Sequence, residues 1–288
     1  MNFCEKLKSK KFIVTCEIGP PKGVNVDEYL KDADAVKGRI DAINVTDLQS
    51  SVMRLGSLAF SYLLVKRGIE PIYQMTCRDR NRLALQSDLL SAYVLGIRNV
   101  LALTGDHPIL GDHPQAKAVY DLDSAGLLKV AKCLEQGKDM VGKNLEGSPH
   151  FCLGAAVNPG AEPLEPEIIK MKKKIEAGAQ FFQTQAIFDI ALLKNFMKLT
   201  KGLGVSIIAG VVMLKSANTA HFMNKHVPGV FVPEYIIDEM EKANDKSQKS
   251  IEIAARLIGD IKTLANGVHI MPIGMNKKVP PLLEAAKL

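Results

Sequence analysis

The stretch NVLALTGDHP, at residues 99–108, decides the fold because it shows how a buried strand ends in this chain. Its first half, through Leu103, is a short apolar run of the kind found in strands that are covered by helices. The run stops at Thr104 and Gly105, and a carboxylate follows at Asp106. The stretch therefore predicts a parallel sheet whose strands end in polar side chains.

Eight apolar runs of this kind recur along the chain, and longer segments with helical spacing lie between them. The runs are FIVTCEI (12–18), IDAINVT (40–46), IEPIYQMTC (69–77), IRNVLALT (97–104), FCLGAAV (151–157), AQFFQTQ (179–185), VSIIAGVV (205–212) and VHIMPIG (268–274). Helices are predicted where the spacing is helical and a Gly stop signal follows, at 26–38, 80–96, 124–137, 165–178 and 189–202.

Eight strand–helix units in 288 residues favour an α/β fold of the (β/α)8 TIM-barrel type, with residues 1–288 as a single domain. A doubly wound open sheet is the weaker alternative, because no GxGxxG motif follows the first run. The longest irregular connections are 107–123 and 142–150, and the first is predicted to lie on the active face of the barrel.

Composition limits the classes of function. The formal net charge is +6, the basic residues are scattered among acids, and Trp is absent, which disfavours a nucleic-acid-binding protein. The basic start has no apolar core of a signal peptide, and the longest apolar stretch, VSIIAGVVML (205–214), is too short to span a membrane. Five cysteines without a CxxC pair indicate reduced thiols. A soluble, cytoplasmic protein is expected.

The carboxyl ends of the strands form the active face of such a barrel, so the residues there carry the functional prediction. They are carboxylates, amides and hydroxyls, without a histidine–carboxylate metal cluster, and no metal is predicted. This set suits a polar heterocycle such as a pterin or an isoalloxazine ring. The strand-end residues are Glu17, Thr46, Gln74, Thr76, Asp106, Asn158, Gln183, Gln185 and Gly274.

Each candidate also has a structural interpretation. Glu17 could pair with a neighbouring Lys, and Asp106 could be a turn residue. The motif GDHP occurs at 105–108 and again at 111–114, but only the first copy ends a strand, so Asp112 is assigned to a loop. The histidines of the two copies, His107 and His113, are interpreted as solvated loop residues rather than metal ligands.

Two basic stretches are ambiguous. RDRNR (78–82) opens a helix and could meet a phosphate there, although a solvated basic face explains it equally well. The lysines at 172–174 belong to the polar side of their helix, and one of them could turn inward at the barrel rim.

The chain resembles the methylenetetrahydrofolate reductase family, whose members are flavin-dependent barrel enzymes of one-carbon metabolism, over essentially its whole length. E-x-x-P-P at the first strand and A-L-x-G-D at the fourth are the strongest parts of the resemblance. The resembling segments are VTCEIGPPKG (14–23), INVT (43–46), MTC (75–77), LALTGDHP (101–108), KKKIEAGAQFFQTQAIFD (172–189) and GVHIMPIG (267–274).

The resemblance implies roles for these positions. Glu17 falls on the general acid, Asp106 on the aspartate between flavin and folate, and Gln185, with Gln183, on the side that holds the pterin. The flavin contacts implied by the resemblance are Thr46, Gln74, Thr76, Asp106 and Lys174. The methylene carbon bridges two folate nitrogens, so a carboxylic acid must protonate one nitrogen to open the ring, while a fixed carboxylate offsets the developing positive charge.

The chain departs from well-known bacterial members at three places. Asp47 and Leu48 replace a Tyr-Gly pair, Gln74 and Met75 stand where a histidine precedes Thr-Cys, and Ala217 replaces a phenylalanine that contacts the nicotinamide. The flavin is therefore FAD or FMN, with FAD preferred, and NADH is one candidate electron donor. Similar forms in acetogenic bacteria work with an accessory zinc or electron-transfer subunit, so such a partner, and an oligomer, are expected.

Two other functions stay open at this point. A folate-dependent methyltransferase barrel is the first, although a thiol-activating version needs a cysteine zinc site that the spacing does not offer. A non-catalytic barrel subunit of a larger complex is the second. Retention of Glu17, Asp106 and Gln185 together disfavours the second, because a scaffold has no need of all three.

Overall fold

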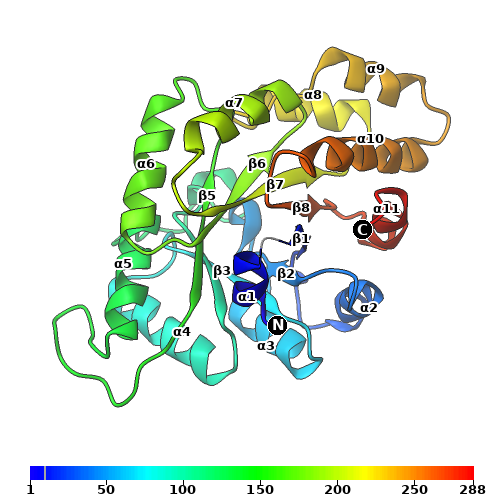
Figure 1. The fold of residues 1–288 in the computed structure, drawn as a ribbon. Coiled ribbons are helices and arrows are strands. Elements are labelled where there is room, and N and C mark those ends of the chain that lie inside the picture. Colours follow the sequence, from blue (N-terminus) through cyan, green and yellow to red (C-terminus); the bar gives the residue numbers. More distant parts are fainter. Residues whose placement is uncertain (10) are drawn as a thin grey trace.

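Eight parallel strands close into a barrel in chain order, and the last strand pairs with the first (Figure 1). The computed structural model describes residues 1–9 and 11–288. The strands are β1 (Ile13–Ile18), β2 (Ala42–Val45), β3 (Pro71–Thr76), β4 (Asn99–Leu103), β5 (Cys152–Val157), β6 (Phe181–Ala186), β7 (Ser206–Val212) and β8 (Gly267–Met271). All eight coincide with the predicted runs, which confirms the (β/α)8 barrel.

Helices surround the strands, and more of them form than the sequence predicted. The five predicted ones are α2 (Asp27–Val36), α4 (Arg82–Val94), α5 (Ser124–Glu135), α6 (Glu165–Glu176) and α7 (Ile190–Thr200). The others are α1 (Phe3–Lys8), α3 (Ser57–Lys66), α8 (Ala217–His226), α9 (Glu234–Lys242), α10 (Lys246–Ile261) and α11 (Val279–Ala285), with 3-10 turns η1 (Gln49–Ser51), η2 (Pro108–Leu110) and η3 (Asn276–Lys278). The stop glycines after the predicted helices all adopt positive φ, as that signal requires.

The inside of the barrel has levels, because every second side chain of a strand points inward. On β1, Ile13 lies lowest, Thr15 lies above it and Glu17 reaches the mouth. The lowest level, here called the lower cluster, consists of Phe3, Ile13, Ala42, Ile72, Leu101, Cys152, Phe181 and Ile208. Above it is the polar layer, whose hydrogen-bonded members are Thr15, Asn44, Gln183 and His269.

Helix α1 closes the barrel at the end where the strands begin, and Figure 1 shows it in front of that opening. Its Phe3 side chain is fully buried and meets the ring of Phe181 edge-on, with 5.4 Å between the ring centroids. The helix is fixed from outside as well, since the backbone N–H of Phe3 donates to the Glu70 carboxylate at 2.9 Å. A Cβ on Gly154 would lie 2.2 Å from the Phe181 ring, so that glycine makes room for it.

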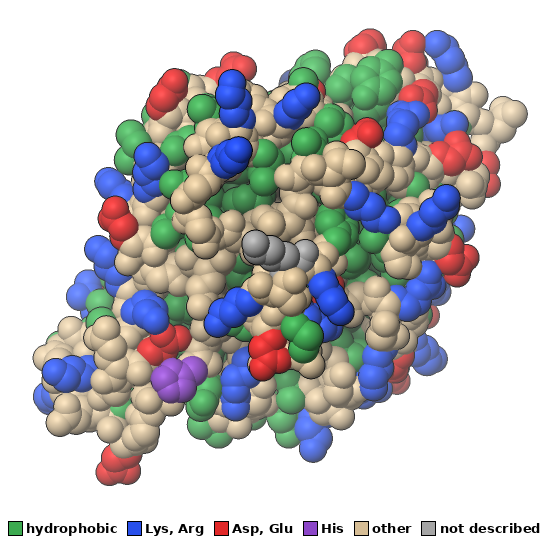
Figure 2. Space-filling view, viewed as in Figure 1, with side chains coloured by type: hydrophobic (Ala, Val, Ile, Leu, Met, Phe, Trp, Pro, Cys, Tyr) green, Lys and Arg blue, Asp and Glu red, His purple; other side chains and the backbone are tan. Residues whose placement is uncertain are grey.

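The surface around this closed end carries mixed charges. Figure 2 shows lysine and arginine side chains spread among acidic ones around the rim, with apolar side chains between them. Across residues 1–9 and 11–288, no helix has both the length and the apolar character that crossing a bilayer requires.

Candidate active site

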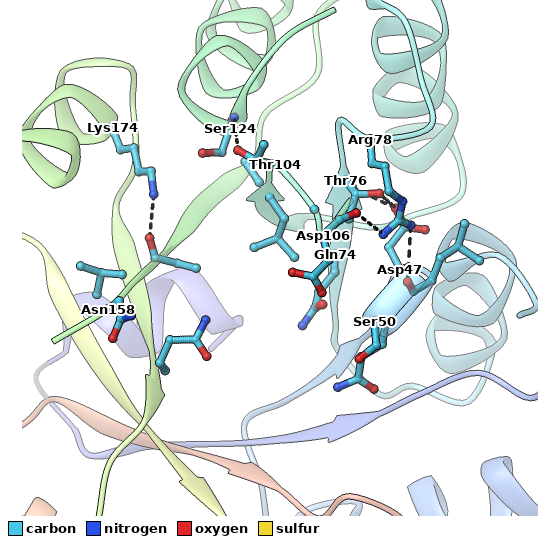
Figure 3. Close-up of a pocket in the computed structure, with 18 of the residues that line it drawn as sticks. Asp47, Ser50, Gln74, Thr76, Arg78, Thr104, Asp106, Ser124, Asn158 and Lys174 are labelled. Carbon is cyan, nitrogen blue, oxygen red and sulfur yellow. Dashed lines mark hydrogen bonds between the residues drawn. The ribbon is translucent and has the colours of Figure 1, made fainter. Parts of the chain in front are cut away.

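A cleft of about 350 Å³ opens at the carboxyl ends of the strands, within the range of small-molecule sites (Figure 3). Side chains from the ends of β2 to β6 and from helix α6 form its walls. Six of the predicted site residues line it: Gln74, Thr76, Asp106, Asn158, Lys174 and Gln185. Most of the predicted residues therefore lie on the cleft wall, although their roles are a separate question.

Asp106 lines the cleft, and two side chains from other loops hydrogen-bond to its backbone carbonyl. Its carbonyl accepts from the Ser51 hydroxyl at 2.9 Å and from the Arg78 guanidinium at 3.3 Å. Leu48, Ser50 and Ser51 all have φ between 48° and 59°, a left-handed conformation that non-glycine residues rarely adopt. Arg78 is 2% exposed and also donates to the Leu48 carbonyl at 3.4 Å, so it joins this strained loop to Asp106.

Thr76 faces the cleft with its hydroxyl proton already used. Its hydroxyl and its backbone N–H donate to the same Asp47 oxygen, at 2.8 and 2.9 Å. The Asp47 carboxylate is completely buried and is neutralised by Arg80, with 2.7 Å between nitrogen and oxygen. Because the Thr76 proton points away, its oxygen can only accept a hydrogen bond from a ligand in the cleft.

Lys174 is the lysine of the 172–174 stretch that turns inward, whereas its two neighbours are exposed. Its ammonium donates to the carbonyl of Ala156 at 2.8 Å and lies on the opposite side of the view in Figure 3 from Asp47 and Thr76. Burial lowers the pKa of Lys174, and the nearby Glu167 carboxylate opposes that shift. A partly desolvated cation here favours an anionic group of a ligand.

Glu17 lies at the top of β1, beside the residues that line the cleft rather than among them. Its Oε1 accepts from Gln49, a cleft residue, at 3.0 Å, and its Oε2 lies 3.7 Å from Nε2 of His269. The side chain is 11% exposed. The contacts of this carboxylate are thus an amide and an imidazole, in place of the lysine that the structural interpretation required.

Two predicted contacts, Thr46 and Gln183, are buried and are not among the residues that line the cleft. The Thr46 hydroxyl is buried and has no hydrogen-bond partner within the described part of the chain. Gln183 exchanges hydrogen bonds with Asn44, at 2.6 and 3.0 Å, inside the polar layer. The structure therefore brings Gln183 to Asn44, two residues below Gln185 on the same strand face, and Gly274 lies away from the cleft beside Lys215.

The arginines of RDRNR satisfy neither interpretation of that stretch. Arg78 pairs with Asp79 at 2.8 Å, Arg80 with Asp47 and Asp88, and Arg82 with Asp121 at 2.7 Å. Each arginine of the stretch is therefore paired with an acid, and the stretch joins loops instead of offering a phosphate site or a solvated basic face. Asp79 lies within the stretch, but Asp47 follows β2 and Asp121 precedes α5, and no local pattern reveals those two partners.

The second GDHP copy also has a structural use that the sequence did not show. Asp112 contacts Lys22 and His113 and accepts from the backbone N–H of Met53 at 3.0 Å, so it connects three loops of the active face. His107 caps η2 by accepting from the N–H of Ile109 at 3.2 Å. Within residues 1–9 and 11–288, no three His, Cys, Asp or Glu side chains are grouped as metal ligands would be.

Four residues in and around the site are not among the predicted site residues, namely Asp47, Gln49, Arg78 and His269. Asp47 directly follows β2, so its place at a strand end was a usable signal. His269 pairs in register with Thr15 of β1 and therefore points inward, which strand alternation alone could have indicated. Gln49 and Arg78 lie on loops, where periodicity gives no information.

Solved structures with the same fold differ in what they bind. One is a Clostridium thermocellum protein described as binding two copies of 5-methyl-5,6,7,8-tetrahydrofolic acid, with a TM-score of 0.61, 16% identity and coverage of 98% of this chain and 97% of that one. Another is 2,3-dimethylmalate lyase, with a TM-score of 0.54, 11% identity and coverage of 99% and 84%. At such identities the likeness establishes the barrel and leaves the activity open.

Relatives in sequence carry one name. A probable methylenetetrahydrofolate reductase (NADPH) of Caenorhabditis elegans is 23% identical over 98% of this chain, which spans 43% of that protein's length. The 5,10-methylenetetrahydrofolate reductases of Pectobacterium carotovorum and Escherichia coli are 30% and 23% identical over 51% and 68% of this chain, which is 45% and 61% of their own lengths. The family model described as methylenetetrahydrofolate reductase matches residues 2–287, and the chain belongs to that family.

Proposed function

We propose that this barrel reduces 5,10-methylenetetrahydrofolate to 5-methyltetrahydrofolate, with residues 1–288 serving as one flavin- and folate-binding unit. The observation that carries the proposal is the convergence of Asp106, Gln185 and Lys174 on one cleft, with Glu17 joined to that cleft through Gln49. Membership of the reductase family supports it, and so does a structure of the same fold that binds a methylated folate.

The donor set of the cleft fits a flavin. Lys174 offers a partly desolvated cation to a phosphate-bearing tail, and Thr76 offers an acceptor to a ring N–H. The buried and unpaired hydroxyl of Thr46 is a group that a ligand would satisfy, and Gln74 adds an amide. A bound flavin, which we propose to be FAD rather than FMN, supplies the hydride of the reaction.

In this proposal the chain's own residues supply the proton and the negative charge that stabilises the opened substrate. Glu17 donates a proton to the folate nitrogen that leaves the methylene carbon, so the five-membered ring opens. The Asp106 carboxylate offsets the positive charge that develops on the opened substrate. Gln185 presents an amide with both donor and acceptor to the pterin edge, and Gln183 supports it from the layer below.

A different part of the barrel bears on our proposal for the electron donor. Ala217 lies in the first turn of α8, is 8% exposed and packs into the apolar cluster around α8 to α10, away from the cleft walls. We propose that an electron-transfer or zinc-containing partner subunit, rather than NADH directly, reduces the bound flavin. Rapid reduction of the purified, flavin-loaded chain by NADH would contradict this part of the proposal.

The first experiment is an anaerobic titration of the chain after incubation with FAD or FMN. We expect a flavin absorbance band that bleaches on addition of methyltetrahydrofolate. Glu17→Gln should still bind the folate and should lose at least about 100-fold in the rate of bleaching, the usual size of an acid–base contribution. Glu241→Gln, an exposed glutamate that also faces a histidine at 3.7 Å, is the matched control. Failure to bind either flavin would overturn the proposal and favour a folate methyltransferase or a scaffold.

A further inference from the structure

Two of the five cysteines meet at the closed end of the barrel, opposite the cleft described above. Cys4 lies on α1 and packs against the lower cluster, of which Cys152, the first residue of β5, is a member. The Cys152 thiol donates a hydrogen bond to the Cys4 sulfur. The two residues lie far apart in the sequence, so the fold itself brings their sulfur atoms together.

The backbone next to each cysteine is fixed by a carboxylate from another part of the chain. The backbone N–H of Phe3, which precedes the first cysteine, donates to Glu70 at 2.9 Å. The backbone N–H of Phe151, which precedes the second, donates to Glu135 at 2.9 Å. A disulfide requires a narrow range of separations between the two residues, and a contact between fixed backbones maintains such a separation.

Solvent reaches the two thiols unequally. A cavity of about 350 Å³ opens beside α1, and its walls include Cys4 and Lys8 together with residues at the starts of β6 and β7. Cys4 is partly exposed, whereas Cys152 is 3% exposed. A small reagent that enters the cavity therefore meets the sulfur of Cys4 first, and Cys152 lies behind it.

The surrounding charges also divide the roles of the pair. The hydrogen bond from Cys152 lowers the pKa of Cys4 to about 6, although burial opposes this shift. The Lys8 ammonium lowers it further, whereas the Glu5 and Glu135 carboxylates act in the opposite direction. At neutral pH Cys4 is therefore mainly a thiolate, the form that reacts with oxidants. Cys152 keeps its proton, because the hydrogen bond to Cys4 and burial both raise the pKa of its thiol.

We propose that Cys4 and Cys152 are a peroxide-sensitive thiol pair that closes to a reversible disulfide and joins α1 to β5. The Cys4 thiolate attacks one oxygen of hydrogen peroxide, the O–O bond breaks, hydroxide leaves and takes a proton from solvent, and Cys4 becomes a sulfenic acid. The Cys152 sulfur then attacks the Cys4 sulfur, the S–O bond breaks, and the thiol proton leaves with the hydroxide as water. The two thiols lose two electrons, and the peroxide is reduced to two molecules of water.

The second step is favoured by the first. As a sulfenic acid, Cys4 no longer carries the negative charge that kept Cys152 protonated. The disulfide would close a loop of about half the chain, and such a cross-link stabilises a fold mainly by restricting the unfolded state. Both thiols lie at the end of the barrel opposite the cleft, so their oxidation is independent of the reaction proposed there.

The test treats the reduced, folded chain with hydrogen peroxide, alkylates the remaining thiols in urea, and maps tryptic peptides by mass spectrometry without reduction. We expect peptide 1–6 joined to peptide 144–170 as the main cross-link, and we expect dithiothreitol to remove it. Cys4→Ser and Cys152→Ser should each abolish the cross-link. Cys133→Ser, which removes another partly exposed thiol, is the matched control and should retain it.

Two further measurements show whether the fold is responsible. Peroxide added in urea, where the thiols are no longer held together, should yield this cross-link no more often than other cysteine pairs. Oxidised wild-type protein should unfold at a higher urea concentration than reduced protein, and Cys4→Ser should show no such difference.

A different pattern of oxidation would overturn the inference. Such patterns are a bond from Cys4 to another cysteine, a bond between two copies of the chain, Cys4 converted to a sulfinic acid without a bond to Cys152, and Cys4 left unmodified. Peptide mapping of the wild-type protein decides between these outcomes even if Cys152→Ser fails to fold.

Discussion

The two ends of the barrel interior are built from opposite materials. At the closed end, the lower cluster is apolar, and its largest members, Phe3 and Phe181, are fully buried. At the open end, buried carboxylates, guanidinium groups and amides meet, and Asp47 with Arg80 forms a charged pair without exposure on the acid side. The polar layer separates the two. Apolar packing therefore stabilises the closed end, whereas hydrogen bonds and ion pairs fix the geometry of the open end.

The two materials respond differently to substitution. Apolar burial stabilises the fold in proportion to area, whereas a buried ion pair contributes little net stability and mainly fixes geometry. We therefore expect changes at the closed end to alter stability with no effect on the chemistry. Changes at the open end should alter ligand binding more than stability.

The largest expected effect is at the closed end. Phe181→Ala removes a ring packed against Phe3 and Gly154 and should lower the free energy of unfolding by about 3–5 kcal/mol. Flavin binding per folded molecule should stay the same, because the ring lies two levels below Gln185. Urea denaturation followed by circular dichroism measures the first quantity and absorbance the second. Phe222→Ala, which is 59% exposed, should cost less than about 0.5 kcal/mol. Equal losses of unfolding free energy in Phe181→Ala and Phe222→Ala would contradict the view that apolar packing stabilises the closed end.

The next effect is at the open end. Asp47→Asn keeps the shape but leaves the Arg80 charge opposite a neutral amide, so we expect a loss of about 2–3 kcal/mol in the free energy of unfolding. Flavin affinity should fall as well, because the neutral Asn oxygen holds the Thr76 proton less strongly than the carboxylate that turns it away from the cleft. Asp238→Asn, which breaks an exposed pair with Lys242, is the control and should change neither quantity. Unchanged flavin affinity in Asp47→Asn would show that the contacts of Asp47 with Thr76 and Arg80 do not affect flavin binding.

A smaller effect with a distinctive pH dependence is expected at Lys174. Its pKa is lowered by burial, so the folded state holds this proton less tightly than the unfolded state. The cost to stability is complete at neutral pH and is relieved as pH rises through the lowered pKa toward 10.5, the ordinary lysine value. Lys174→Met should abolish that rise, change stability at pH 7 by less than about 1 kcal/mol, and weaken flavin binding. Lys173→Met, exposed on the same helix, should retain both properties of the wild type.

The smallest effect is chemical and leaves the fold unchanged. A hydrogen bond from the Cys152 thiol lowers the pKa of Cys4, and Lys8 adds to that shift against the desolvation of the site. Cys4 should therefore react with iodoacetamide faster than partly exposed Cys133 at pH 7, as peptide mass spectrometry would measure. Cys77, whose pKa burial raises to about 12, should stay unlabelled. Slow labelling of Cys4 would show that the closed end is as inert chemically as its apolar composition suggests.

Sequence patterns predicted the strands and six residues of the cleft wall for a physical reason. Alternation along a strand determines which side chains point inward, and parallel strands bring their carboxyl ends to one rim. Thr76 follows from both rules, whereas Asp106, beyond the end of β4, and Gln185, at a register shift of β6, follow only from the second. The inward turn of Lys174 at the rim was also anticipated.

The other features of the site could not be predicted, because they depend on the level of a residue inside the barrel and on partners far away in the sequence. Gln183 and Gln185 share a face, but only the barrel's tilt and stagger decide that the lower one joins Asn44 and the upper one reaches the cleft. Arg80 and Arg82 find their acids Asp47 and Asp121 more than 30 residues away in the sequence, so no local window contains both members of these two pairs. The left-handed loop at 48–51 has no glycine to announce it, so it could not be predicted.

The closure of the barrel by α1 has a consequence for folding during synthesis. Ile13 of β1 pairs with Gly267 of β8, and Phe3 of α1 packs against Phe181 of β6, so residues of the first two elements of the barrel find their partners among elements that are made later. Contacts this far apart in sequence form slowly. The apolar residues of α1 and β1 remain without their final partners until β6 and β8 have been made, which makes them a natural site for a chaperone to hold.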